Sequence, residues 1–133
     1  NGTPHRWLAL NGLTNDAVDV EDWKDTDGDG MAAWKEYWAG TDPTNVASVF
    51  AITNAVPPPP AGRVLIAFSS VSGRVYQVWC CSNLMTNVWI KTTYATSPVT
   101  SWESADITGR TVNTTIYLDP AEVRRFYRLN LAP

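Results

Sequence analysis

Residues 25–36 of the chain read DTDGDGMAAWKE. Acids stand at positions 1, 3, 5 and 12 of this stretch, and a glycine, Gly30, stands at position 6. Four carboxylates this close together repel one another strongly unless a cation lies between them. Gly30 can adopt a backbone conformation that a Cβ would strain, so the chain can turn sharply between the acids. The stretch therefore predicts a tight loop that gathers carboxylates around a cation.

The spacing of the acids is the calcium pattern of an EF-hand loop. Calcium is a hard cation that takes six to eight oxygen ligands at about 2.3–2.6 Å. We expect the three aspartates to supply carboxylate oxygens, a backbone carbonyl to face inward, and the glutamate to close the shell with two oxygens. The alternative interpretation is an acidic turn without an ion. The predicted calcium ligands are Asp25, Asp27, Asp29, Met31 and Glu36.

A short helix is expected directly after the loop. Residues 32–39 read AAWKEYWA, and the next residue, Gly40, is the type that most often follows a last helical turn. Trp34, Tyr37 and Trp38 are three and four residues apart, so they share one helix face. We expect these rings to pack against the rest of the chain rather than to bind a ligand.

A truncated second copy of the loop and helix is predicted at residues 1–12. A shift of 28 residues places Gly2 on the glycine of the loop and Gly12 on the glycine that ends the helix. A helix is expected over 4–11, between these two glycines. Leu8 falls on the closing glutamate, so this copy is not expected to bind calcium well, and a second ion there stays an open alternative.

Charge is divided unevenly along the 133 residues, whose net charge is −3. Residues 1–45 hold nine acids and three bases, whereas 46–133 hold four acids and seven bases. We therefore predict a calcium-binding segment over 1–46 and a separate module over 47–133. The acidic balance argues against a nucleic-acid partner, and no apolar run is long enough to span a membrane.

The second module is predicted to be a small antiparallel β-sandwich, which makes the fold class mainly β with a short two-helix EF-hand-like segment in front. Short apolar stretches with alternating side chains are separated by turn-forming clusters. The prolines 57–60 are expected to span a loop in polyproline II form. The predicted strands are 48–53, 63–70, 74–81, 88–93, 111–118 and 124–130.

Two parts of the sequence resemble known modules. Residues 25–45, DTDGDGMAAWKEYWAGTDPTN, resemble the thrombospondin type-3-like calcium repeats of large secreted bacterial proteins, and residues 1–14, NGTPHRWLALNGLT, are similar to the helix of a preceding repeat. Dockerins share the loop but pair two intact repeats to bind cohesin. Residues 71–92, VSGRVYQVWCCSNLMTNVWIKT, with 124–133, RRFYRLNLAP, resemble a C-terminal fibronectin type III-like β-sandwich of secreted planctomycete and verrucomicrobial proteins.

These resemblances imply architecture and location more than an activity. The chain is expected to belong to a larger parent protein that is secreted or lies at the cell surface, and to bind Ca²⁺. No G-x-S-x-G, H-E-x-x-H or phosphate-binding motif occurs, and no catalytic residue is predicted. The acids that could pair for glycoside hydrolysis have no signal that aims them at a cleft; they are Glu103, Asp106, Asp119 and Glu122.

Two functions remain open. The first is a non-catalytic, calcium-stabilised structural module of the parent protein. The second is a carbohydrate-binding or cell-surface-protein-binding module, dockerin-like or similar to carbohydrate-binding modules, attached to an extracellular enzyme. In that case exposed aromatic rings would stack on sugars, and the candidates are Trp102, Tyr94 and Trp89.

The only two cysteines, Cys80 and Cys81, are adjacent in a predicted strand. Successive side chains of a strand point to opposite faces, so we expect two free thiols, one buried and one partly exposed. The alternative is a vicinal disulfide, which needs a distorted turn. The pair lies just before the turn-forming Ser82-Asn83, so this alternative stays open at the level of sequence.

Overall fold

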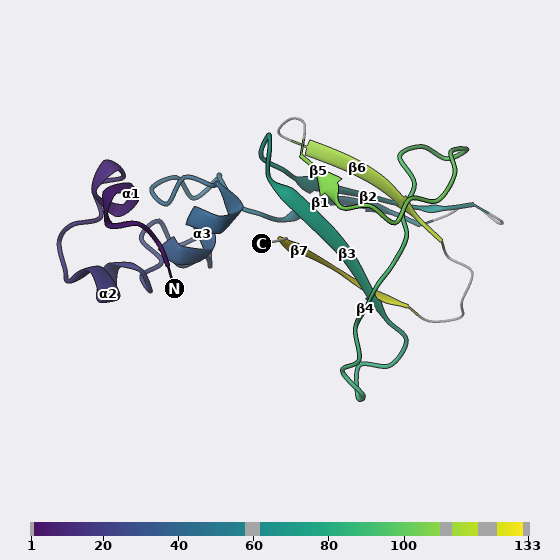
Figure 1. The fold of residues 1–133 in the computed structure, drawn as a ribbon, viewed down its shortest axis with the longest axis horizontal. Helices are drawn as coiled ribbons and strands as arrows, with labels where there is room; N and C mark the ends of the chain where they lie inside the picture. Colours follow the sequence, from purple (N-terminus) through teal and green to yellow (C-terminus); the bar gives the residue numbers. More distant parts are fainter. Residues whose placement is uncertain (1, 58–61, 110–112, 120–124, 132–133) are drawn as a thin grey trace. The chain divides into compact units, whose positions relative to one another are not determined.

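The structure is a computed structural model that describes residues 2–57, 62–109, 113–119 and 125–131 (Figure 1). The chain divides into two compact units, Asn1–Phe50 and Ala51–Pro133. The boundary predicted from the sequence lies four residues earlier, after residue 46. The described part is mainly β, with two antiparallel sheets in the second unit and only short helices in the first.

The first unit contains three helices over residues 2–50, one more than predicted: α1 (His5–Leu10), α2 (Val18–Glu21) and α3 (Ala33–Ala39). The unexpected turn, α2, is closed by a side chain, because Glu21 Oε1 accepts the Asp16 backbone N–H at 2.8 Å. Its two valines are weak helix formers, and the sequence has no periodic apolar pattern here that would predict a helix. In the described part of the chain no helix is long and apolar enough to cross a membrane.

The predicted 28-residue repeat has a counterpart in the backbone glycines. Gly2 has a φ of 85° and Gly30 a φ of 95°, and both precede a helix. Gly12 has a φ of 73° and Gly40 a φ of 77°, and both follow one. Glycine adopts this left-handed region without the penalty that a Cβ imposes. Each loop–helix copy is thus bounded by two left-handed glycines.

The same capping hydrogen bond also recurs 28 residues apart. The Leu13 N–H donates to the Leu8 carbonyl at 2.9 Å, and the Thr41 N–H donates to the Glu36 carbonyl at 3.1 Å. Leu8 and Glu36 occupy equivalent places in the two copies, and they are 1% and 0% exposed. The first copy therefore buries an apolar side chain where the second buries a carboxylate.

A small apolar cluster holds the first unit together. Leu8, Leu13 and Ala33 are buried, and Trp7 and Val18 pack against them. Because these residues come from all three helical segments or their flanks, the cluster joins the two copies. A further ring pair links α1 and α3, since Trp7 and Tyr37 lie edge to face with centroids 5.4 Å apart.

The second unit consists of two antiparallel sheets (Figure 1). One sheet has the order β1-β2-β6, and in the other β3 pairs with β4, β5 and β7. The arrangement agrees with the predicted β-sandwich. The strands are β1 (Ile52–Val56), β2 (Val64–Ser69), β3 (Val75–Cys81), β4 (Ile90–Lys91), β5 (Ile107–Thr108), β6 (Asn113–Leu118) and β7 (Phe126–Leu131).

The core of this unit is formed by the inward-facing residues of the central strands. Phe68 on β2 is 0% exposed and Tyr76 on β3 is 1% exposed. Their rings meet edge to face with centroids 5.2 Å apart, and this pair links the two sheets. The Tyr76 hydroxyl also accepts the Val71 backbone N–H at 2.8 Å, so its polar end is satisfied inside the core.

Strands β1, β4 and β5 differ from the prediction. The first predicted strand, 48–53, is shifted to Ile52–Val56, and the predicted strand 88–93 shrinks to Ile90–Lys91. The two-residue β5, Ile107–Thr108, was not predicted. All residues of β1 and β4 are exposed, so backbone pairing rather than apolar burial selects these residues, and pairing leaves little trace in a hydrophobic pattern.

Several predictions fall wholly or partly outside the described residues. These are the polyproline II segment over prolines 58–60, residues 111–112 of the predicted strand 111–118, residue 124 of the last predicted strand, and Glu122. The described remainders of the two strands are β6 and β7.

Gly109 is predicted to tolerate no side chain. A Cβ at this position would lie 2.3 Å from the Val71 carbonyl oxygen and 3.1 Å from the Tyr76 ring. The Gly109 backbone also bonds to Arg74 and Gly73, so it cannot retreat without breaking those bonds. Gly109→Ala is expected to destabilise the protein by about 2 kcal/mol or more in a denaturant titration. The matched exposed variant Gly73→Asn, at a left-handed turn position with open space around it, is expected to cost less than about 1 kcal/mol.

Candidate metal site

The loop after α2 is folded around the side chain of Asp25. Its Oδ1 accepts the Gly28 N–H at 2.8 Å and its Oδ2 accepts the Gly30 N–H at 2.9 Å. Gly28 and Gly30 have φ values of 82° and 95°, which permit the turn that brings both N–H groups onto one carboxylate. The hydrogen bonds of Asp25 thus fix the backbone conformation of the loop that carries the other acids.

The next two aspartates each use one oxygen for the loop and leave the other inside it. Asp27 Oδ1 accepts the Asp29 N–H at 3.1 Å, and Asp29 Oδ1 accepts the Met31 N–H at 2.7 Å. The Oδ2 atoms of Asp27 and Asp29 are buried and have no hydrogen-bond partner. Carboxylate oxygens of Asp25, Asp27 and Asp29 lie within 4.8 Å of one another.

Glu36, in the first turn of α3, is 0% exposed, but its carboxylate is not among the oxygens of Asp25, Asp27 and Asp29 that lie within 4.8 Å of one another. Its Oε1 accepts the Thr41 hydroxyl at 3.4 Å, whereas its Oε2 is buried without a partner. Burial and the charges of Asp27, Asp29 and Asp25 raise the pKa of Glu36 to about 7, although the hydrogen bond from Thr41 lowers it. The glutamate is thus in an environment that disfavours its charged form in the metal-free protein.

The donor set suits a hard cation. Three carboxylate oxygens, on Asp27, Asp29 and Glu36, are buried without a donor, and such atoms are costly in a folded protein unless a donor or an ion meets them. The nearby Lys24 ammonium does not neutralise these oxygens, because it pairs with Asp16 and Glu21. Oxygen-only ligands select calcium or magnesium rather than zinc or copper.

Met31, the predicted carbonyl ligand, is the seventh of the twelve loop residues. Its N–H is bonded to Asp29, and its sulfur accepts the Phe50 N–H at 3.4 Å. Two backbone hydrogen bonds close the base of the loop, from the Ala33 N–H to the Lys24 carbonyl at 2.9 Å and from the Trp34 N–H to the Asp22 carbonyl at 3.1 Å. The ends of the loop are therefore held together by the backbone itself.

The pKa of Glu36 predicts how the metal-free protein responds to pH. In the unfolded chain this carboxyl titrates near 4.5, and in the folded chain near 7. Between these values the folded state holds more protons than the unfolded state, so stability falls as pH rises through this window. In EDTA, the melting temperature is expected to be lower at about pH 7.5 than at about pH 5. Glu36→Gln, which cannot ionise, should flatten this difference, and an unchanged slope in that variant would contradict the assignment.

The aromatic residues predicted as ligand contacts lie in different environments. Trp102 is 39% exposed, and Arg63 stacks on it with the guanidinium carbon 4.1 Å from the ring centroid. Trp89 is partly buried, and Arg128 stacks on it at 4.5 Å. Tyr94 is 5% exposed, so the prediction of an exposed ring is wrong there. Its backbone pairs with Glu103, which places it inside the unit rather than on the surface.

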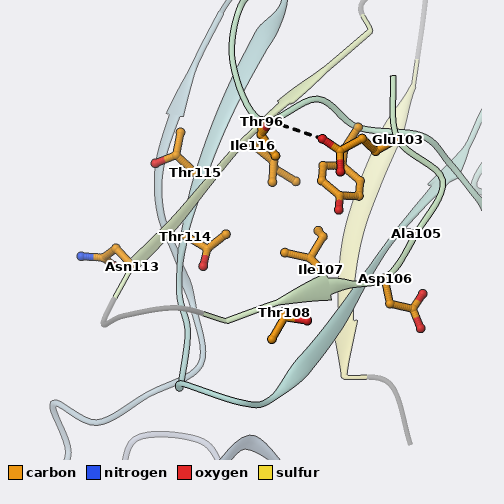
Figure 2. A pocket seen from close by; sticks show the side chains of 11 residues that line it. Thr96, Glu103, Ala105, Asp106, Ile107, Thr108, Asn113, Thr114, Thr115 and Ile116 are labelled. Atoms are coloured by element: carbon orange, nitrogen blue, oxygen red, sulfur yellow. Dashed lines mark hydrogen bonds between the residues drawn. The ribbon is translucent and has the colours of Figure 1, made fainter. Parts of the chain in front are cut away.

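A cleft of about 620 Å³ lies between β5 and β6 (Figure 2). Ile107 and Ile116 point into it, and the Glu103 carboxylate at its rim accepts the Thr96 hydroxyl at 3.3 Å. Asp106 points away from it and is held by hydrogen bonds from Lys91 and Gln77, which lower its pKa. Glu103 and Asp106, which are three residues apart in the sequence, are therefore not paired in the cleft.

Both cysteines are free and both are buried, Cys80 at 5% exposure and Cys81 at 2%. The vicinal disulfide is absent, and the predicted partial exposure of one thiol is wrong. Strand alternation places Cys81 on the outer side of β3, but the turn that follows covers it, and its sulfur donates to the Asn83 carbonyl at 3.0 Å.

Two arginines of the aromatic sites were not predicted from the sequence. Arg63 donates to the carbonyls of Ser97 and Thr100 at 2.9 and 2.8 Å, and Arg128 lies over two indoles. The spacing of these residues along the chain carries no signal for such contacts.

Comparisons with protein-family models, characterised proteins and solved structures give no match to this chain.

Proposed function

We propose that this chain is a non-catalytic module of a larger exported bacterial protein and that calcium, bound by the loop 25–36, stabilises its first unit. The observation that carries the proposal is the set of buried carboxylate oxygens without donors on Asp27, Asp29 and Glu36. These are three of the residues that the EF-hand pattern selects as calcium ligands. The resemblance to thrombospondin type-3-like repeats supports the same role.

A stabilising role fits an extracellular location. Extracellular EF-hand-like modules bind calcium with dissociation constants of about 10⁻⁴–10⁻³ M. An ion that binds only the folded state with such a constant adds about 0.4–1.4 kcal/mol of stability at a calcium concentration of about 1 mM. The ligands are expected to gather only in the folded segment, where the charges of Asp27, Asp29 and Asp25 act on Glu36. No catalytic step is required of this site.

The proposal is tested by calcium titration calorimetry together with thermal unfolding in calcium and in EDTA. Asp27→Ala is expected to remove the calcium dependence of the melting temperature. Asp19→Ala, which deletes an exposed acid on α2 outside the loop, is expected to keep that dependence and serves as the charge-matched control. A wild-type melting curve that is the same in EDTA and in calcium would overturn the proposal.

A carbohydrate-binding role is the second candidate, and the geometry of Trp102 favours it. The Arg63 guanidinium is anchored by two backbone carbonyls and stacks on this indole, which keeps 39% of its surface exposed. A ring held in one orientation loses little entropy on binding a sugar. On a glycan array, Trp102→Ala is expected to weaken the signals, and an array without wild-type signals would count against this role.

A further inference from the structure

The outer face of the sheet around β3 contains a guanidinium that lies over two indoles. Arg128 on β7 lies with its guanidinium carbon 4.5 Å from the ring centroid of Trp89 and 5.8 Å from that of Trp79. Arg128 is exposed, and both indoles are partly exposed. Stacking of this kind fixes the plane of the guanidinium while its N–H edges stay accessible.

The strand register builds this arrangement. Trp79 on β3 lies opposite Arg128 on β7 and opposite Lys91 on β4. Directly paired residues of neighbouring strands project to the same face of a sheet, so Lys91, Trp79 and Arg128 form one row. The residues before and after Trp79, Val78 and Cys80, are buried on the opposite face. The row therefore lies on the side of the sheet away from the core.

Within the described part of the chain, Arg128 donates no hydrogen bond and forms no salt bridge. In contrast, Arg63 bonds to two backbone carbonyls, and Lys91 pairs with Asp106. Arg128 thus carries the uncompensated charge of the row. Residues 51–133 hold seven bases and four acids, so the whole unit is also positively charged.

We propose that this face, defined by Lys91, Trp79, Arg128 and Trp89, binds an acidic saccharide. The oriented guanidinium can donate two parallel N–H bonds to the two oxygens of a carboxylate or a sulfate. The apolar side of the adjoining sugar ring can rest on the exposed part of an indole. A neutral sugar would leave the charge of Arg128 unused, and an acidic peptide would leave the indoles unused, so the combination selects a charged sugar.

This inference goes beyond the calcium role and names a ligand class for the binding-module alternative. It is tested by calorimetry with oligogalacturonate as the carboxylate ligand, chondroitin sulfate as the sulfated ligand, and dextran as the neutral control. At least one acidic saccharide is expected to bind and dextran is not. Arg128→Ala and Trp89→Ala are each expected to weaken binding by about tenfold or more. Arg6→Ala, which removes an exposed positive charge from α1, should leave the affinity within about twofold.

Arg128→Lys keeps the charge but cannot form the bidentate contact. This variant therefore tests the role of Arg128 if the alanine variant is unstable. It is expected to weaken binding while the near-ultraviolet circular dichroism and the melting temperature stay unchanged. Saccharide binding should persist in Asp27→Ala, so loss of the calcium site and loss of this site are separable. The proposal is overturned if neither acidic saccharide binds, if dextran or polyaspartate binds equally well, or if Arg6→Ala and Arg128→Ala weaken binding equally.

Discussion

Replacing Glu36 by leucine is expected to abolish the response to calcium and, at the same time, to raise the stability of the calcium-free protein. The wild-type carboxylate is 0% exposed, and one of its oxygens has no partner. An unpaired buried polar group costs about 1–3 kcal/mol. The repeat shows that leucine fits this place, because Leu8 occupies the equivalent position of the first copy and is 1% exposed. We therefore expect a gain of about 1–3 kcal/mol in EDTA at neutral pH.

The measurement is thermal and denaturant unfolding of the wild type and the variant, in EDTA and in calcium. The matched control is Glu21→Leu, at a second buried glutamate that is 2% exposed. Glu21 differs because its Oε1 accepts the Asp16 N–H and contacts the Lys24 ammonium. That substitution strands two donors, so it should destabilise the protein with or without calcium. A Glu36→Leu protein that is less stable than the wild type in EDTA, or one that still responds to calcium, would contradict this prediction.

Phe68→Ala is expected to have the largest effect in the β-sandwich unit. The side chain is 0% exposed and packs edge to face on Tyr76, which belongs to the other sheet. Removing a buried phenylalanine costs about 3–5 kcal/mol, from lost transfer free energy and from the cavity left behind. The paired tyrosine cannot close that space easily, because its hydroxyl is bonded to the Val71 N–H.

The stability of this variant is measured by guanidinium unfolding, followed by near-ultraviolet circular dichroism. Phe126→Ala is the control, because this phenylalanine on β7 is 40% exposed and should cost less than about 1.5 kcal/mol. Equal losses in the two variants would mean that the two sheets do not meet at Phe68. Calcium binding by the loop 25–36 should be retained in Phe126→Ala, since its ligands come from the first unit.

The strands that the sequence predicts best are β2, β3 and β6, each of which buries alternate residues, and β7, whose first residues alternate between exposed and partly buried. β2, β3, β6 and β7 agree closely with the predicted 63–70, 74–81, 111–118 and 124–130 over the residues described. Alternation is visible in β3, where Tyr76, Val78 and Cys80 are buried and their neighbours Gln77 and Trp79 are partly exposed. Strands β1 and β4 are wholly exposed and β5 has only two residues, and these three strands were shifted, shortened or missed. Helix α2 was missed for a related reason, since a side-chain hydrogen bond rather than periodic burial closes it.

The sequence by itself determined the local features of this protein: the spacing of the loop acids, the left-handed glycines, and the period of the central strands. These depend on residues that are near neighbours along the chain, where geometry follows directly from spacing. Only the tertiary structure decided which oxygens of the loop lack a donor, that Tyr94 is buried, and that Arg128 lies over both Trp79 and Trp89. Those facts depend on strand register and on helix packing between distant segments, which bring together residues whose separation in sequence carries no signal of their contact.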